Sequence, residues 1–156
     1  MYKKLTDAQL LEVVAAVKFP VGSHTRVLAT TRADQGTMEK ICGAVFPAGR
    51  VALQLIENPD SGADVAGAFV NQTATVSPTV YANQVRTGKC DSKINRTRMK
   101  GLPAGAVALT TGNADIPFRV ILARGKVVIV VEERAIPSLV EHVAAAVATY
   151  DKLAGA

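Results

Sequence analysis

The sequence predicts an α+β fold: a mostly antiparallel sheet of about five or six strands, with an N-terminal and a C-terminal helix packed on it. Three observations indicate this. Helical patterns occur near the two ends of the chain, the segments between them are rich in Val, Ile and Thr, and turn residues separate those segments. The chain has 156 residues, of which 49% are apolar, so it can form a core without metal or disulfides. We expect a single domain over residues 1–156.

The first helix is predicted to follow Leu5. Thr6 and Gln9 have the spacing of a capping box, in which each side chain binds a free backbone N–H group of the first turn. Pro20 cannot continue a helix, so the helix should end shortly after Lys18. Between these limits, apolar residues recur at helical spacing at Leu10, Val13, Val14 and Val17.

The middle of the chain gives weaker signals. Thr25 to Thr31 is rich in β-branched residues and predicts a strand. Thr37 to Phe46 fits either a short helix or a strand, and we favour the helix. Ala63 to Val70 fits a strand or a short helix. Thr73 to Val85 predicts an edge strand or a broken strand, because Pro78 cannot donate a hydrogen bond to a central strand pair.

A seven-residue motif occurs twice in the chain. The segment from Pro47 to Leu53 matches the segment from Pro103 to Leu109 at six of seven positions. Pro-Ala-Gly favours a turn, and Val-Ala-Leu favours the start of a strand. The repeat fits either an internal duplication or the chance recurrence of a useful turn. We favour chance, because the flanking residues barely match.

Three strands are predicted in the C-terminal third, at Val107 to Thr111, Phe118 to Ala123 and Lys126 to Glu132. Arg124-Gly125 fits a two-residue hairpin loop between the last two strands. The last strand is apolar without alternation, which predicts that both of its faces are covered. A closing helix is predicted to begin at Pro137 and to bury an apolar stripe formed by Leu139, Val143, Ala146, Val147 and Tyr150.

The positive charge of the protein is concentrated in one segment. The chain carries 18 Lys and Arg against 13 Asp and Glu, a net charge of +5. Residues 86–100 contain six of the basic residues and a single acidic one, Asp91, so the other 12 basic and 12 acidic residues balance. The six basic residues are Arg86, Lys89, Lys93, Arg96, Arg98 and Lys100.

This basic segment has two interpretations. It is either a solvated surface loop or a contact for a polyanion, because each phosphate that the protein neutralises releases a counterion. We expect a basic loop or hairpin arm over about residues 84–103 whose six cations bind nucleic acid or another polyanion through phosphates. No aromatic residue lies between Tyr81 and Phe118, so base stacking is not expected and binding should be weakly selective for sequence.

The composition favours a structural role. Ala and Val dominate, Thr is frequent, Trp is absent and aromatic residues make up 4%. Such chains are typical of self-assembling shell and coat subunits, including those of viruses and phages. We therefore expect a non-enzymatic protein that forms a homo-oligomer. The surfaces between copies are expected on the apolar strand Lys126 to Glu132 or on the terminal helices.

An enzymatic function has few candidate residues. The only histidines are His24 and His142, and the sequence contains none of the HExxH, CxxC, GxSxG or phosphate-loop motifs. We therefore predict no catalytic residue, no metal and no cofactor. The alternatives are a small enzyme for a phosphate or carboxylate substrate, which would depend on His24 or Cys90, and a regulatory module that binds another protein through the basic segment.

The cysteines and the N-terminus bear on location. The first residues lack the apolar segment of a signal peptide, and no apolar run is long enough for a membrane helix. We therefore expect no membrane contact, and a protein that is cytoplasmic or assembled into a particle, with Cys42 and Cys90 as reduced thiols. Cys90 should be the more reactive thiol, because the neighbouring positive charge favours the thiolate.

Overall fold

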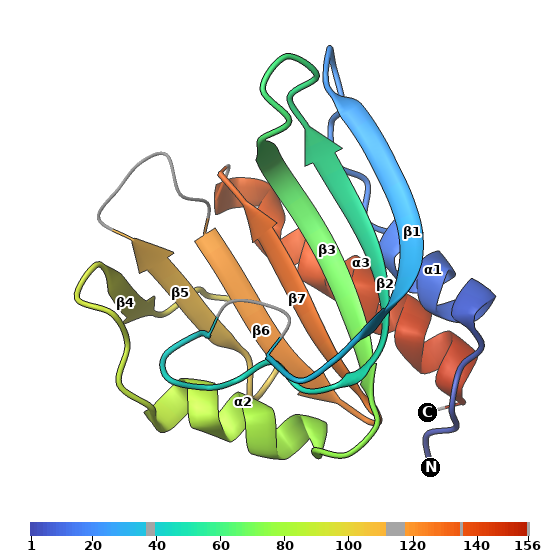
Figure 1. Cartoon of the computed structure of the whole chain (residues 1–156), viewed down its shortest axis with the longest axis vertical. Coiled ribbons are helices and arrows are strands. Elements are labelled where there is room, and N and C mark those ends of the chain that lie inside the picture. The colour runs from blue at the N-terminus through green and yellow to red at the C-terminus, as the bar shows by residue number, and fades with distance from the viewer. Residues whose placement is uncertain (37–39, 112–117, 135, 156) are drawn as a thin grey trace.

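The structure is a computed structural model that describes residues 1–36, 40–111, 118–134 and 136–155. Within these residues, seven antiparallel strands form one sheet in the order β1-β2-β3-β7-β6-β5-β4, and three helices pack on it (Figure 1). The elements in chain order are α1 (Asp7–Ala15), β1 (Thr25–Ala33), β2 (Gly49–Glu57), β3 (Asp64–Thr73), α2 (Pro78–Thr87), β4 (Ile94–Thr97), β5 (Val107–Thr111), β6 (Phe118–Arg124), β7 (Val127–Glu133) and α3 (Ile136–Ala154).

The α+β class and the antiparallel sheet are confirmed, but the predicted number of strands is wrong. The sheet in the described residues has seven strands rather than five or six. The prediction did not include β4, because its four residues lie among charged residues and show no apolar alternation. Pairing with β5, from Ile94 opposite Thr111 to Thr97 opposite Ala108, makes this segment a strand. The uncertain segment from Ala63 to Val70 is also a strand, β3.

The two faces of the sheet have separate cores. α1 and α3 lie behind the sheet in Figure 1, over a core that includes Ile56 and Leu122. α2 packs on the opposite face together with residues 41–46, over a core that includes Phe46, Tyr81 and Ile121. The terminal helices are therefore packed on one face of the sheet, as predicted.

Strand β7 belongs to both cores. Its position is the middle of the strand order, between β3 and β6. Ile129 faces α1 and α3, whereas Val128 and Val130 face the α2 side. The prediction that both faces of this strand are covered is thus confirmed. The expectation that Lys126 to Glu132 serves as a surface between copies is wrong, because a central strand covered by two cores has no free face.

The start of α1 is as predicted. Gln9 donates its backbone N–H to the Thr6 hydroxyl at 3.2 Å, and the Gln9 side chain accepts from the Thr6 backbone N–H at 3.0 Å. The end of the helix depends on the sheet. The buried Gln54 side chain of β2 donates to the carbonyl oxygens of Val14 and Val17, at 2.6 and 2.9 Å. The Val14 carbonyl also accepts from the Val17 backbone N–H at 3.2 Å, so Gln54 is an additional donor at the helix end.

The closing helix α3 buries the predicted stripe. Leu139, Val143, Ala146 and Tyr150 are buried, and Val147 is half-buried. The preceding hairpin is displaced by one residue from its predicted position, since Arg124 pairs with Val127 and the loop is Gly125-Lys126. No helix in the described part of the chain is long and apolar enough to cross a membrane.

Helix α2 replaces the strand predicted for Thr73 to Val85. The strand β3 ends at Thr73, and Pro78 occupies the first position of the helix. Proline suits that position because backbone N–H groups in the first turn of a helix have no acceptor within the helix, so a residue without an N–H loses no hydrogen bond there. Tyr81 and Val85 lie one helical turn apart and are buried in the α2 core. The prediction treated Pro78 as a sign of an edge strand and did not consider that a proline can begin a helix.

The short helix favoured for Thr37 to Phe46 is also wrong. Residues 37–39 lie outside the described residues, and the chain after them forms a tight turn in which Ile41 and Ala44 exchange backbone hydrogen bonds. Cys42 and Gly43, at the tip of this turn, have φ angles of +49° and +79°. Positive φ angles are incompatible with a right-handed helix. The apolar residues of this segment are buried against the sheet without forming a helix.

The repeated motif has two different structures. Gly49 is an extended residue of β2 that lies close against β3, where an added Cβ would collide with the Asn71 side chain. Gly105 lies in a turn before β5 with a φ of +83°. The two copies both lead into strands but use their glycines differently, which favours chance recurrence over duplication.

Candidate polyanion-binding surface

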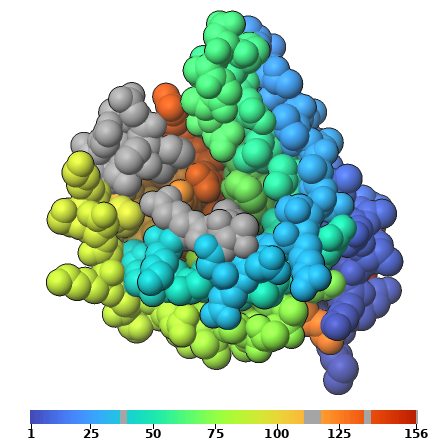
Figure 2. All heavy atoms as spheres, in the orientation of Figure 1, coloured from blue at the N-terminus to red at the C-terminus, as the bar shows by residue number. Residues whose placement is uncertain are grey.

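The basic segment follows α2 and forms one edge of the sheet. Arg86 lies in the last turn of α2, residues 88–93 connect to β4, and Arg96 lies within β4. Arg98 and Lys100 follow β4 on the way to β5. The segment is coloured yellow in Figures 1 and 2, where it occupies the left side of the molecule. The six cations therefore lie along one edge of the protein rather than being spread over it.

Two of the six cations are bound to backbone oxygens of the protein. The Arg96 guanidinium donates to the carbonyl of Val85 at 2.6 Å and to that of Gly88 at 2.5 Å, so it binds the end of α2. Arg86 donates to the carbonyl of Gly105 at 2.5 Å. A positive group at a helix C-terminus also interacts favourably with the helix dipole. These two arginines hold α2, β4 and the turn before β5 together.

The other four cations are exposed and have no hydrogen-bond or ion-pair partner among the described residues. They are Lys89, Lys93, Arg98 and Lys100. Among the described residues, no carboxylate forms an ion pair with any of the six basic residues of the segment. The segment's positive charge is therefore presented to solvent.

Four arginines elsewhere in the protein are paired with acids. Arg50 donates to both carboxylate oxygens of Asp7, and this hydrogen bonding lowers the pKa of Asp7. Arg124 makes the same two-pronged contact with Asp151, which raises the pKa of Arg124. Arg119 pairs with Glu132 on the sheet, and Arg32 pairs with Asp34 on the surface. The basic segment differs from these four positions, because none of its six cations is paired with a carboxylate among the described residues.

A disulfide fixes the start of the basic segment, so the prediction of two reduced thiols is wrong. Cys90 is bonded to Cys42, in the turn that packs on the same face of the sheet as α2. An added Cβ at Gly88 would collide with the Cys42 carbonyl oxygen, so the two segments are in close contact there. Cross-linking residues 48 apart in sequence stabilises the fold by about 4 kcal/mol in the loop-entropy model.

The disulfide also removes Cys90 as one of the two residues, His24 or Cys90, on which the enzymatic alternative depends. A thiol in a disulfide has no thiolate to act as a nucleophile. The separation of 48 residues explains why the sequence did not indicate the bond: nothing in it states that the turn at Cys42 and the end of α2 share a face of the sheet. The described residues contain no cluster of His, Cys, Asp or Glu that could hold a metal ion.

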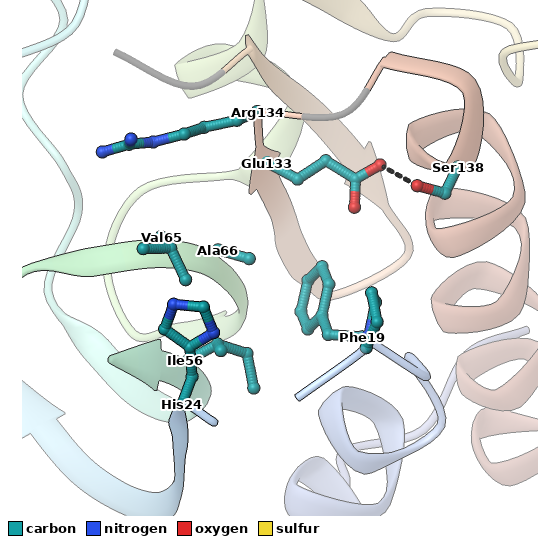
Figure 3. Close-up of a pocket in the computed structure, with 9 residues that line it drawn as sticks. Phe19, His24, Ile56, Val65, Ala66, Glu133, Arg134 and Ser138 are labelled. Carbon is teal, nitrogen blue, oxygen red and sulfur yellow. Dashed lines mark hydrogen bonds between the residues drawn. The ribbon is translucent and has the colours of Figure 1, made fainter. Parts of the chain in front are cut away.

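His24 lines a small pocket to which the basic segment contributes no residue. The cavity has a volume of about 170 Å³ and lies between the start of β1, the ends of β2 and β7, and the start of α3 (Figure 3). Its wall is mostly apolar, with Phe19 and Ile56 among the lining residues. The His24 ring lies 3.1 Å from the Val21 carbonyl, so one of its nitrogens already has a partner.

His142 is buried beside this pocket in a pair with Glu133. Its Nδ1 lies 2.6 Å from one Glu133 carboxylate oxygen, and the Ser138 hydroxyl donates to the other at 3.0 Å (Figure 3). The Phe19 ring packs edge-on against the imidazole. Both carboxylate oxygens therefore have internal partners, which is typical of a satisfied polar group in a core. We assign this group to the packing of α3 on β7.

A larger hollow of about 450 Å³ lies at the opposite end of the sheet from the pocket of His24. Lys4, Arg32 and Arg50 line it, together with backbone and side chains of β2 and β3. Two of these cations, Arg32 and Arg50, are in ion pairs with acids. The hollow is therefore a weaker anion site than the basic edge.

The comparisons give no relative from which to assign a function. No protein-family model, no curated protein and no solved structure matches the chain.

Proposed function

We propose that this protein is a non-enzymatic, self-assembling structural protein that binds a polyanion, such as nucleic acid, through phosphate contacts at its basic edge. The concentration of unpaired cations in one short segment carries the proposal. Lys89, Lys93, Arg98 and Lys100 are exposed without partners among the described residues, whereas Arg50 and Arg124 are paired with carboxylates. Unpaired cations gathered on one edge repel one another, and a polyanion relieves that repulsion.

The chemistry of this edge suits a phosphate backbone rather than bases. Lysine ammonium groups act as mobile point charges, and the Arg98 guanidinium can bind two phosphate oxygens at once. The described part of the edge offers no aromatic side chain on which a base could stack. We therefore expect binding that is driven by counterion release, depends strongly on salt and discriminates little between sequences.

Within the edge, the six cations have two roles. Arg86 and Arg96 are positioning residues, because they already donate to backbone carbonyls of the protein. The four free cations are the contacts for phosphates. The disulfide at Cys90 lowers the entropy lost when the connection carrying Lys89 and Lys93 is ordered against a ligand.

The proposal is tested by the salt dependence of binding to single-stranded RNA and to heparin. For the double variant Arg98→Glu with Lys100→Glu, we expect the slope of log K against log salt on RNA to fall by about 1.4, because each lost contact removes about 0.7. The matched control is Lys3→Glu with Lys152→Glu, which changes the net charge equally at exposed positions far along the chain. The control should retain most of the wild-type slope.

Equal losses in the two double variants would mean that net charge alone drives binding, and would contradict the proposal. So would binding by the wild-type protein that does not change with salt. The assembly part is tested separately by light scattering on the wild-type chain, where an oligomer of two or more copies is expected and a monomer at all concentrations would exclude it.

A further inference from the structure

The sheet is open, and its two outer strands are very different. The edge at β4 is four residues long and lies among cations, which is how natural proteins protect an edge from pairing with another strand. The edge at β1 is nine residues long, pairs with β2 without a bulge, and contains neither proline nor lysine. Among the described residues no strand pairs with its outer side, which lies at the right of Figure 1.

The two arginines of β1 already have partners within the chain. Arg26 donates to the carbonyl of Phe19, and Arg32 lies in an ion pair with Asp34. Near the middle of the strand, Leu28 is 44% exposed, one of the few large apolar residues on the described surface. Leu28 lies opposite Gln54 of β2 and so shares the face of the sheet that α1 covers.

We propose that β1 is the interface with a second copy of this chain, in which two β1 strands pair antiparallel across a two-fold axis and the two sheets become one. The inference rests on the assembly part of the proposed function and names the surface used. A second copy suits this edge because it offers the same unprotected backbone, and an isologous contact closes after two subunits.

The sequence of β1 favours the register in which Leu28 faces its own copy. Opposite residues in an antiparallel pair lie on the same face of the sheet. In a symmetric pair of β1 strands, one residue must therefore lie opposite the same residue of the second copy, and the two-fold axis passes between these two residues. An axis at Ala29 would set Arg26 opposite Arg32, and like charges directly opposite each other are destabilising. An axis at Thr30 would set Leu28 opposite Arg32. An axis at Leu28 sets leucine against leucine and pairs Arg26 with Thr30, which leaves no like charges opposed.

The first experiment measures the oligomeric state by analytical ultracentrifugation. The wild-type chain is expected to dimerise, and Leu28→Lys, which opposes two lysines at the axis, should raise the dimer dissociation constant about tenfold or more. The matched control is Val80→Lys, since Val80 is 47% exposed on α2 and away from β1. It should dimerise like the wild type. A wild-type monomer, or a dimer unaffected by Leu28→Lys, would overturn the inference.

A second experiment tests the register without disturbing the strand. Leu28→Cys introduces the one free thiol, since both natural cysteines are in the disulfide. Two such thiols at the axis are expected to cross-link into a covalent dimer under mild oxidation. In Thr30→Cys, the two thiols would be about 13 Å apart along the strands and should not cross-link. The reverse pattern, with cross-linking at Thr30 alone, would refute the register.

The interface and the polyanion surface are separable. Leu28→Lys should keep the wild-type slope of log K against log salt per chain, because β1 and β4 are at opposite edges of the sheet. If Leu28→Lys is monomeric and keeps the wild-type salt slope, the β1 interface is supported. This holds even if the wild-type slope is too small to indicate phosphate contacts, in which case only the proposed polyanion binding fails. Loss of the slope together with the dimer would count against separate surfaces.

Discussion

Tyr81 buries a polar hydroxyl in the apolar core on the α2 side of the sheet. Its ring is fully buried and meets the Phe46 ring edge-on, which suits an aromatic pair. Its hydroxyl has no hydrogen-bond partner among the described residues. Burial raises the pKa of Tyr81 to about 12, because the charged form is poorly solvated there. The hydroxyl therefore contributes nothing favourable to this core.

Removing that hydroxyl should stabilise the protein. We expect Tyr81→Phe to raise the free energy of unfolding by about 1 kcal/mol at pH 7, because it relieves the desolvation of an unpaired polar group. The comparison is Tyr150→Phe, since the Tyr150 hydroxyl accepts from the Lys126 backbone N–H at 3.0 Å. That variant should lose about 1 kcal/mol. Urea unfolding of both variants measures the difference, and a loss for Tyr81→Phe would contradict the assignment.

The same residue gives a pH dependence. The folded pKa of Tyr81, about 12, is above its ordinary value of 10.0, so its titration has no effect on stability below pH 10 and lowers the stability of the wild type as pH rises from 10 towards 12. Tyr81→Phe should therefore gain further on the wild type between pH 10 and 12. Unfolding measured across this range checks the sign.

At the scale of elements, side chains from strands complete the ends of two helices. Gln54 of β2 binds the last carbonyls around α1, and Arg96 of β4 binds those at the end of α2. Carbonyls at a helix end have no partner within the helix, so a donor from a neighbouring strand fixes where the helix stops. Arg96, one of the six predicted phosphate contacts, already donates to carbonyls at the end of α2, and on this ground we propose that it is a positioning residue.

Substitution of Arg96 should weaken the structure rather than remove a phosphate contact. We expect Arg96→Ala to lower the free energy of unfolding by about 2 kcal/mol and to speed hydrogen exchange in the last turn of α2. The control is Arg98→Ala, because Arg98 is exposed and has no partner among the described residues. It should keep stability within about 0.5 kcal/mol and lower the salt slope instead. Equal stability of the two variants would refute this division of roles.

Across the whole molecule, β7 joins the two cores into one cooperative unit. Its neighbouring residues Ile129 and Val130 point into different cores, so loosening either core disturbs the same strand. The strand also pairs with β3 and β6 over most of its length. We therefore expect the two faces of the sheet to unfold together, although α2 and α3 do not share a core.

This cooperativity can be measured with one substitution in each core. Ile129→Ala should cost about 3 kcal/mol and Val130→Ala about 2 kcal/mol, through lost burial and the cavities left behind. Both should lower a single denaturant midpoint and leave the slope of the unfolding free energy with denaturant unchanged. Val80→Ala, on the exposed side of α2, should change little. Two separate transitions in either core variant would show that the cores are independent.

Much of the fold could be predicted from local patterns. Capping at Thr6, the apolar stripe of α3 and the three C-terminal strands depend on residues close in sequence, and all appear within one residue of their expected positions. The concentration of cations in residues 86–100 is likewise a property of the sequence alone. These features were predictable because short-range spacing decides helix starts, strand faces and local charge.

The remaining features depend on which segments meet across the sheet. The sequence does not indicate that Cys42 forms a disulfide with Cys90, that Pro78 begins a helix, or that the Arg96 guanidinium donates to a carbonyl of α2. Strand order places the long β1 at one edge and the apolar β7 at the centre, although β7 looked suited to an interface. Such pairings join residues tens of positions apart, and only the packed chain brings their atoms within bonding distance.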